Sequence, residues 1–168
     1  MDLPLGPYFF CIDTSALLDL KVHYPSQVFP DVWNDLAHLA DREQLIAPQE
    51  VLAEIEKGDD EVTHWAREHN AMFLNLDEEQ LAIVTEIMKK FPRLVDPNKP
   101  TPDADPFVIA LAQSKIATVL AHENRADPNK KPKIPSVCDY YGIRCIRLKD
   151  LFVEQGWKYQ KPTEKETH

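Results

Sequence analysis

Four acidic residues in this sequence stand at the predicted ends of strands or within the helices that follow them. Asp13 comes directly after the uninterrupted apolar run of residues 9–12, and Glu123 follows a second such run. Glu54 lies in a predicted helix after a third run, and Asp105 opens the most apolar helix of the chain. Uninterrupted apolar runs of this length are typical of strands buried on both faces, as in a parallel sheet.

The carboxyl ends of parallel strands meet at one edge of the sheet, where the ligands of open α/β proteins bind. If the helices also begin at that edge, the four carboxylates converge. Two carboxylates about 4 Å apart repel by roughly 4 kcal/mol at an effective dielectric constant near 20, so the cluster must bind a cation or protons. A ligand set of oxygens alone favours Mg²⁺ or Mn²⁺. Such an ion suits the hydrolysis of phosphodiesters.

Two of these acids also have a purely structural interpretation at a helix N-terminus. Asp13 would cap the helix that begins near Ser15. Asp105 precedes Pro106, and a proline in the first helical position would make Asp105 the N-cap. In that case Asp103 would serve in its place.

The other two acids have competing neighbours. Glu54 and Glu56 both flank the apolar face of their helix, so helical periodicity does not choose between them, and Glu50 lies on the same helix. Glu123 and Asp127 are both consistent with ordinary acids in a loop. The fourth acidic ligand therefore stays open between Glu123, Asp127 and Asp103.

The elements that must position these acids alternate between strands and helices. Strands are expected at residues 9–12, 44–47, 118–121 and 143–148, and the ambiguous residues 72–76 are assigned to a loop. Helices are expected at residues 15–20, 30–42, 49–57, 59–70, 78–91, 103–115, 136–141 and 149–155. This alternation predicts crossover connections and a mainly parallel sheet.

Composition indicates one globular domain over residues 1–157, followed by a polar, frayed tail at residues 158–168. The 168 residues are 43% hydrophobic and 28% charged. The sequence shows no signal peptide and no apolar run of membrane length, so a cytoplasmic location without membrane association is expected. The three cysteines have no Cys-x-x-Cys spacing, which favours reduced, buried thiols.

The net charge of −9 argues against a broad electrostatic surface for nucleic acid. It does not exclude a nuclease, because a bound metal ion reverses the local sign. One basic stretch, formed by Lys130, Lys131 and Lys133 with Arg125, is consistent either with a solvated loop or with a phosphate contact beside an acidic cleft.

Histidines are not expected to take part in this chemistry. His64, His69 and His122 do not stand at metal-ligand spacing from any acidic motif.

Three acidic motifs in this order resemble those of PIN domains, and two further motifs resemble the bacterial and archaeal branch that is similar to VapC-type toxins. The resemblance extends over nearly the whole chain, to about Trp157. The acidic motifs are Ile-Asp-Thr-Ser (12–15), Val-Leu-Ala-Glu-Ile (51–55) and Ala-Asp-Pro-Phe-Val-Ile-Ala-Leu-Ala (104–112). The others are Val-Leu-Ala-His-Glu (119–123) and Lys-Ile-Pro-Ser-Val-Cys (133–138).

The resemblance implies a three-layer α/β/α fold and a ribonuclease that depends on Mg²⁺ or Mn²⁺. It also implies frequent homodimers and an antitoxin protein that occludes the site. Carried over residue by residue, it makes Asp13, Glu54 and Asp105 the metal-binding acids. Thr14 or Ser15 would be the supporting hydroxyl that orients the first acid or a metal-bound water.

The sequence departs from the VapC-type pattern after the strand at residues 118–121. Where those toxins commonly show Thr-x-Asn and a following Asp, this chain has Ala121-His122-Glu123, and Glu123 is chosen as the fourth ligand. The departure keeps a second interpretation open, namely a catalytically weak or inactive PIN-like module that binds RNA or a partner protein.

Overall fold

In the described part of the chain, a parallel sheet of five strands forms the centre of the fold. The structure is a computed structural model that describes residues 9–100, 103–124 and 131–161. All paired strands are parallel, and their order across the sheet is β3-β2-β1-β4-β5. The strands are β1 (Phe10–Ile12), β2 (Leu45–Pro48), β3 (Phe73–Leu74), β4 (Thr118–Leu120) and β5 (Cys145–Ile146). Because β1 is the middle strand, the residue that follows it stands at the centre of the carboxyl edge.

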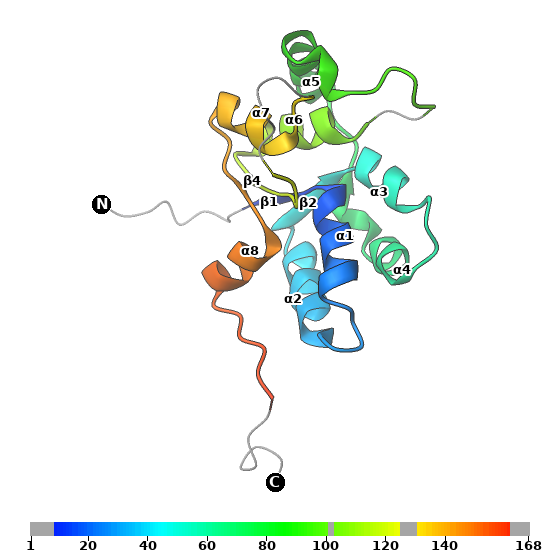
Figure 1. The fold of residues 1–168 in the computed structure, drawn as a ribbon, viewed down its shortest axis with the longest axis vertical. Coiled ribbons are helices and arrows are strands. Elements are labelled where there is room, and N and C mark those ends of the chain that lie inside the picture. Colours follow the sequence, from blue (N-terminus) through cyan, green and yellow to red (C-terminus); the bar gives the residue numbers. More distant parts are fainter. Residues whose placement is uncertain (1–8, 101–102, 125–130, 162–168) are drawn as a thin grey trace, which may run out of the picture.

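Helices cover both faces of the sheet, so the predicted three-layer α/β/α arrangement is confirmed. Figure 1 shows α5, α6 and α7 above the sheet and α1, α2, α4 and α8 below it. The helices are α1 (Thr14–His23), α2 (Pro30–Asp41), α3 (Gln49–Ile55), α4 (Glu61–Glu68), α5 (Glu78–Lys90), α6 (Asp105–Lys115), α7 (Ile134–Tyr141) and α8 (Leu148–Gln155). Two short 3₁₀ turns are η1 (Asn70–Met72) and η2 (Pro92–Leu94).

The core lies between the two helical layers. Ile12 and Leu120, the last residues of the adjacent strands β1 and β4, are completely buried, as expected for strands covered on both faces. On α6, Val108, Ile109 and Leu111 are also completely buried, and this helix contacts β1, β2 and β4. The most apolar predicted helix is thus the central one.

Local sequence signals explain two helix boundaries. The side chain of Asp77 accepts the backbone N–H of Gln80, whose side chain in turn accepts the N–H of Asp77, so the predicted capping box begins α5. Gly142 ends α7 with a φ of 68°, a left-handed conformation that glycine adopts without steric cost.

Two predictions about strands are wrong. The assignment of residues 72–76 to a loop misses β3, whose Phe73 pairs with Ala47 of β2. A strand of two residues is too short to produce a hydrophobic pattern. The strand expected at residues 143–148 is shorter, because Arg147 is the N-cap of α8 and donates its N–H to Asp150.

One residue of the predicted C-terminal tail contacts the helices of the fold. Tyr159 donates its hydroxyl to Asp35 Oδ2 at 2.8 Å, and its ring packs against Phe152. Tyr159 of the predicted tail thus contacts α2 and α8, while residues 162–168 lie outside the described residues. Among the described residues, no helix is both long and apolar enough to cross a membrane. The cysteines form no disulfide, and Cys11 and Cys138 are buried.

Candidate metal centre

Asp13 stands at the centre of the carboxyl edge and divides its two carboxylate oxygens between two roles. Its side chain is 2% exposed. Oδ2 accepts the backbone N–H of Ser15 at 3.1 Å and the Ser15 hydroxyl at 2.6 Å, which caps α1 as the structural interpretation predicted. Oδ1 is buried and has no hydrogen-bond partner among the described residues. One oxygen thus fixes the helix, and the other is available to a ligand.

Glu54 joins α3 to the beginning of α6. Its Oε1 accepts the backbone N–H of Ala104 at 2.8 Å, across a separation of fifty residues. Ala104 is the N-cap of α6, and Asp105 is the first helical residue. The interpretation of Asp105 as the N-cap is therefore wrong, and its carboxylate is not used for capping.

The pKa values of Asp13 and Asp105 show that the four predicted acids act on one another. Burial is the largest cause in both cases, because it disfavours the charged form. Repulsion by Glu123 and Glu54 adds to it, and Asp13 also acts on Asp105. Together these effects raise the pKa of Asp13 to about 6 and that of Asp105 to about 8, although the Ser15 hydrogen bonds lower the former. Asp13 and Asp105 are thus within electrostatic reach of each other and of Glu54 and Glu123, and the four residues form an electrostatic cluster.

Of the three candidates for the fourth acid, Glu123 is the one whose charge acts on Asp13 among the described residues. Its Oε2 also accepts the N–H of Ile134, the first residue of α7, at 3.3 Å. The charge of Asp103 acts on Asp105, but the Asp103 carboxylate already has partners: it accepts the N–H of Asp96 at 2.7 Å and an ammonium hydrogen of Lys99 at 2.5 Å. Asp127 lies outside the described residues.

Of the two candidate hydroxyls, Ser15 is the one that contacts Asp13. Its Oγ donates to Asp13 and accepts the backbone N–H of His122 at 2.9 Å, which links α1 to the segment after β4. Thr14 Oγ1 is buried without a hydrogen-bond partner in the described part of the chain.

Cations flank the cluster, and one of them was not expected from the sequence. Lys131 and Lys133 are exposed, and the charge of Lys131 helps to lower the pKa of Asp103. Arg125 and Lys130 lie outside the described residues. Lys99 was missed because it stands in a proline-rich stretch with no motif. Its hydrogen bond to Asp103 is the largest cause of its raised pKa, and the charges of Glu54 and Asp105 contribute.

The donor set fits a hard divalent cation. Carboxylate oxygens are the ligands that Mg²⁺ and Mn²⁺ prefer. The buried, unpartnered Oδ1 of Asp13 offers a ligand atom. A cation would also offset the repulsion that raises the pKa values of Asp13 and Asp105.

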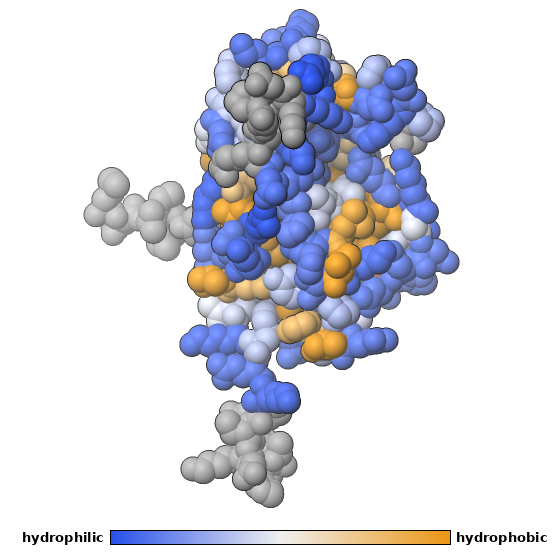
Figure 2. Space-filling model, in the orientation of Figure 1, coloured by the Kyte–Doolittle hydropathy of each residue, from blue (hydrophilic) through white to orange (hydrophobic). Residues whose placement is uncertain are grey.

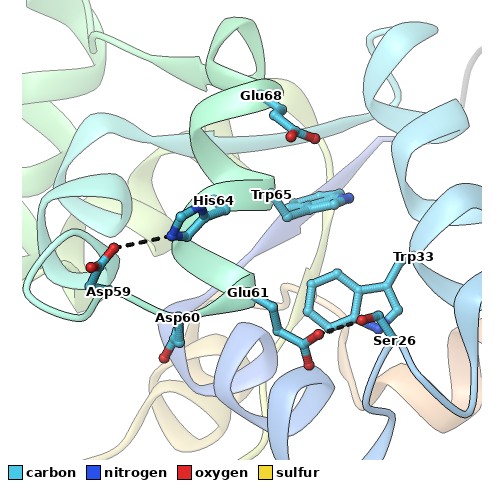
Figure 3. Close-up of a pocket in the computed structure, with 8 residues that line it drawn as sticks. All are labelled: Ser26, Trp33, Asp59, Asp60, Glu61, His64, Trp65 and Glu68. Carbon is cyan, nitrogen blue, oxygen red and sulfur yellow. Dashed lines mark hydrogen bonds and ion pairs between the residues drawn. The ribbon is translucent and has the colours of Figure 1, made fainter.

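A second group of acids lines a pocket of about 520 Å³ beside α4 (Figure 3), and three of them, Asp59, Asp60 and Glu61, have side-chain partners. His64 Nε2 lies 3.1 Å from Asp59, and Glu61 accepts the hydroxyl of Ser26 (Figure 3). Asp60 forms an ion pair with Lys21 at 2.7 Å. Of these acids, Asp60 has its charge offset by a lysine, and Asp59 and Glu61 each have a hydrogen-bond partner.

Comparison with known families gives one match that covers most of the chain. The family described as "Domain of unknown function (DUF4411)" matches residues 10–159. No curated protein matches the sequence.

Two solved structures are similar to this chain over most of its length. The structure of PAE2754 from Pyrobaculum aerophilum is 15% identical with a TM-score of 0.50, and the match covers 90% of this chain and 98% of that one. The structure of VapBC2 from Rickettsia felis, bound to a DNA fragment from its promoter, is 11% identical with a TM-score of 0.51; the match covers 83% and 98%. At these identities the likeness shows the fold alone, which is the PIN-like three-layer arrangement.

Proposed function

The chain belongs to the DUF4411 family, and we propose that it is a ribonuclease of PIN type that depends on Mg²⁺ or Mn²⁺. The observation that carries the proposal is the buried, unpartnered Oδ1 of Asp13, supported by the charges of Glu54 and Glu123, which act on both Asp13 and Asp105. The acidic motifs resemble those of PIN domains, and the fold is similar to that of the VapBC2 structure. We further propose that the protein is the toxin of a toxin–antitoxin pair.

In this proposal Asp13, Glu54 and Asp105 hold the divalent ion and Glu123 completes the site. When bound, the ion would lower the pKa of an attacking water and stabilise the charge on the leaving oxygen of a phosphodiester. Ser15 orients Asp13 through the two hydrogen bonds to Oδ2. Because Asp105 has a pKa of about 8, binding of the ion would release protons near neutral pH.

The proposal is tested by incubating the purified protein with total RNA in Mg²⁺, in Mn²⁺ and in a chelator, beside Asp13→Asn. The asparagine keeps the shape and an oxygen for capping α1, but it removes the charge. We expect cleavage that needs the divalent ion and is lost in the variant, with an unchanged circular dichroism spectrum. A variant that cuts RNA as fast as the parent would show that the site is misassigned.

The second candidate function is a catalytically weak or inactive module that binds RNA or a partner protein. It is favoured by Glu123, which departs from the VapC-type pattern and already accepts the N–H of Ile134. Binding of Mn²⁺ without turnover of any RNA would support this candidate against the nuclease.

A partner protein is part of the proposal, and α1 offers a surface for it. Leu18 is 44% exposed and Val22 is 65% exposed; four residues apart, they share a face of the helix. Figure 2 shows an apolar patch over α1 on a largely hydrophilic face. The face could bind a second copy of this chain or an antitoxin, and sedimentation of the parent and of Leu18→Glu/Val22→Glu distinguishes the two. If the parent is a homodimer formed on this face, the variant should sediment as a monomer. If the parent is itself a monomer, the face is available for an antitoxin.

A further inference from the structure

Asp19, His23 and His122 form a second cluster of metal-ligand side chains, outside the four carboxylates. Asp19 lies in α1 and is buried, His23 is the last residue of α1, and His122 follows β4. Asp19 Oδ1 lies 2.6 Å from His23 Nδ1, and Asp19 Oδ2 lies 3.3 Å from His122 Nδ1. One ligand atom from each residue can be chosen so that all lie within 4.8 Å of one another.

The 3.3 Å contact between Asp19 and His122 lies within ion-pair distance, and it also matches the separation of two ligands of one ion. His122 Nδ1 is buried and has no hydrogen-bond partner among the described residues, although Asp19 Oδ2 is 3.3 Å away. A tetrahedral Zn²⁺ ion with bonds of about 2.0–2.2 Å holds neighbouring ligand atoms about 3.3–3.6 Å apart. A buried polar atom without a partner is costly, and a bound ion would supply that partner.

The orientation of the two rings is compatible with a shared ion. The centroids of His23 and His122 are 5.6 Å apart, and their planes are tilted by 47° rather than stacked. His23 Nδ1 and Asp19 Oδ1 form a hydrogen bond of 2.6 Å. To admit an ion between them, these two atoms must move to about 3.3 Å apart. The His23 side chain is 56% exposed, which leaves it free to make this movement and gives solvent access to the site.

We propose that Asp19, His23 and His122 bind a divalent transition-metal ion of the zinc class. Two imidazoles and one carboxylate favour Zn²⁺ or Co²⁺, whereas Mg²⁺ prefers oxygen ligands alone. Three protein ligands leave one position of a tetrahedral ion for water. The site uses none of the four carboxylates, so it goes beyond the proposed ribonuclease activity and does not depend on it.

A bound ion would join two parts of the fold that the sequence keeps far apart. Asp19 and His23 lie on α1, which begins next to Asp13, and His122 precedes Glu123. The backbone of His122 already donates to Ser15 Oγ at 2.9 Å. The ion would therefore add a second link between α1 and the segment after β4, and it should stabilise the folded state by mass action.

The test measures binding directly, with Co²⁺ as a spectroscopic probe and Zn²⁺ as its competitor. After treatment with a chelator, the parent should show the visible absorption of one Co²⁺ ion in a four-coordinate imidazole site, and Zn²⁺ should remove this absorption by displacing the ion. His23→Gln and His122→Gln should each weaken Co²⁺ binding at least tenfold. Asp19→Asn should do the same, and because His23 is exposed, His23→Gln remains informative if the buried Asp19 variant does not fold.

Two control variants make the assignment specific. His64→Gln removes the exposed partner of Asp59, a His–Asp pair outside the cluster, and should leave Co²⁺ binding unchanged. Asp13→Asn should retain the four-coordinate Co²⁺ spectrum, and Zn²⁺ should raise the melting temperature of Asp13→Asn but not that of the double variant Asp13→Asn/His23→Gln. The proposal is overturned if the parent binds no Co²⁺, or if His23→Gln and His122→Gln bind it as tightly as the parent.

Discussion

At the scale of single residues, one hydrogen bond distinguishes Glu54 from the other acids of its helix. Glu54 accepts the N–H of Ala104, whereas Glu56 is exposed and Glu50 has a buried Oε2 without a partner among the described residues. Of these three, only Glu54 contributes to the raised pKa of Asp13.

We expect Glu54→Gln to abolish metal-dependent cleavage of RNA while the protein stays folded. The glutamine keeps an oxygen for the N–H of Ala104 but lacks the negative charge that a divalent ion needs. Glu50→Gln and Glu56→Gln are the matched controls on the same helix, and each should retain most of the activity. Equal losses in all three variants would count against a specific ligand at Glu54.

The two hydroxyls after Asp13 allow a second comparison. Ser15→Ala removes both hydrogen bonds of the Ser15 hydroxyl, including one that lowers the pKa of Asp13. We expect weaker Mn²⁺ binding at neutral pH and a loss of about 1–3 kcal/mol in the free energy of unfolding. Thr14→Val should have a smaller effect, because Thr14 Oγ1 has no hydrogen-bond partner in the described residues. Calorimetric titration measures the affinity for Mn²⁺, and urea unfolding measures the free energy of unfolding. If Thr14→Val loses more of both than Ser15→Ala, Thr14 rather than Ser15 is the supporting hydroxyl.

At the scale of elements, the stretch before α7 combines an exposed basic surface with the edge of the acidic cluster. Lys131 and Lys133 are exposed, and Lys131 acts electrostatically on Asp103. Cations at this place would offset the acidic character of the protein where a phosphate backbone approaches.

We expect the triple substitution of Lys130, Lys131 and Lys133 by alanine to weaken RNA binding and to flatten its dependence on salt. Each lost phosphate contact should reduce the slope by about one unit at most. The affinity of a catalytically inactive Asp13→Asn background for RNA, measured at several salt concentrations, gives this slope. An unchanged slope would show that these lysines belong to a solvated loop that does not contact RNA.

At the scale of the whole molecule, the acidic cluster couples metal binding to stability. A cation that binds only the folded protein stabilises it by about 2.7 kcal/mol at a hundredfold excess over Kd. For a protein of this size, Mg²⁺ or Mn²⁺ should therefore raise the melting temperature by roughly 5–10 °C. The rise should shrink in Asp13→Asn, which without metal should melt higher than the parent because one repelling charge is absent. If neither ion changes the melting temperature of the parent, and Asp13→Asn without metal melts lower than the parent, Asp13 is only a helix cap.

The same cluster predicts how the stability of the metal-free protein depends on pH. Folding raises the pKa of Asp13 to about 6 and that of Asp105 to about 8, from unfolded values near 3.9. Between about pH 4 and pH 8 the folded state therefore binds more protons than the unfolded state, and the free energy of unfolding falls as the pH rises. Other acids shift in the opposite direction, so the measurement is the difference between the parent and Asp13→Asn. That difference should grow as the pH rises toward 8, and a constant difference would contradict the prediction.

The sequence by itself determined the alternation of strands and helices, the parallel sheet and the acids at its carboxyl edge. These features depend on neighbours along the chain. A buried strand is an apolar run, as in residues 10–12, and the acid after it must emerge at the edge of the core. The capping box at Asp77 and the end of α7 at Gly142 follow from equally local chemistry.

Only the tertiary structure decided which side chains meet across the sheet edge. The choice between the hydroxyls of Ser15 and Thr14 depended on a contact of Ser15 with His122, which lies 107 residues further along the chain. The hydrogen bond from Ala104 identified Glu54, rather than Glu56, as the candidate ligand. The hydrogen bond to Asp103 placed Lys99 beside the acids. Residue spacing fixes the face of a helix on which a side chain lies, but not the partner that packing brings to that face. For the same reason, the cluster of Asp19, His23 and His122 has no signature in the sequence.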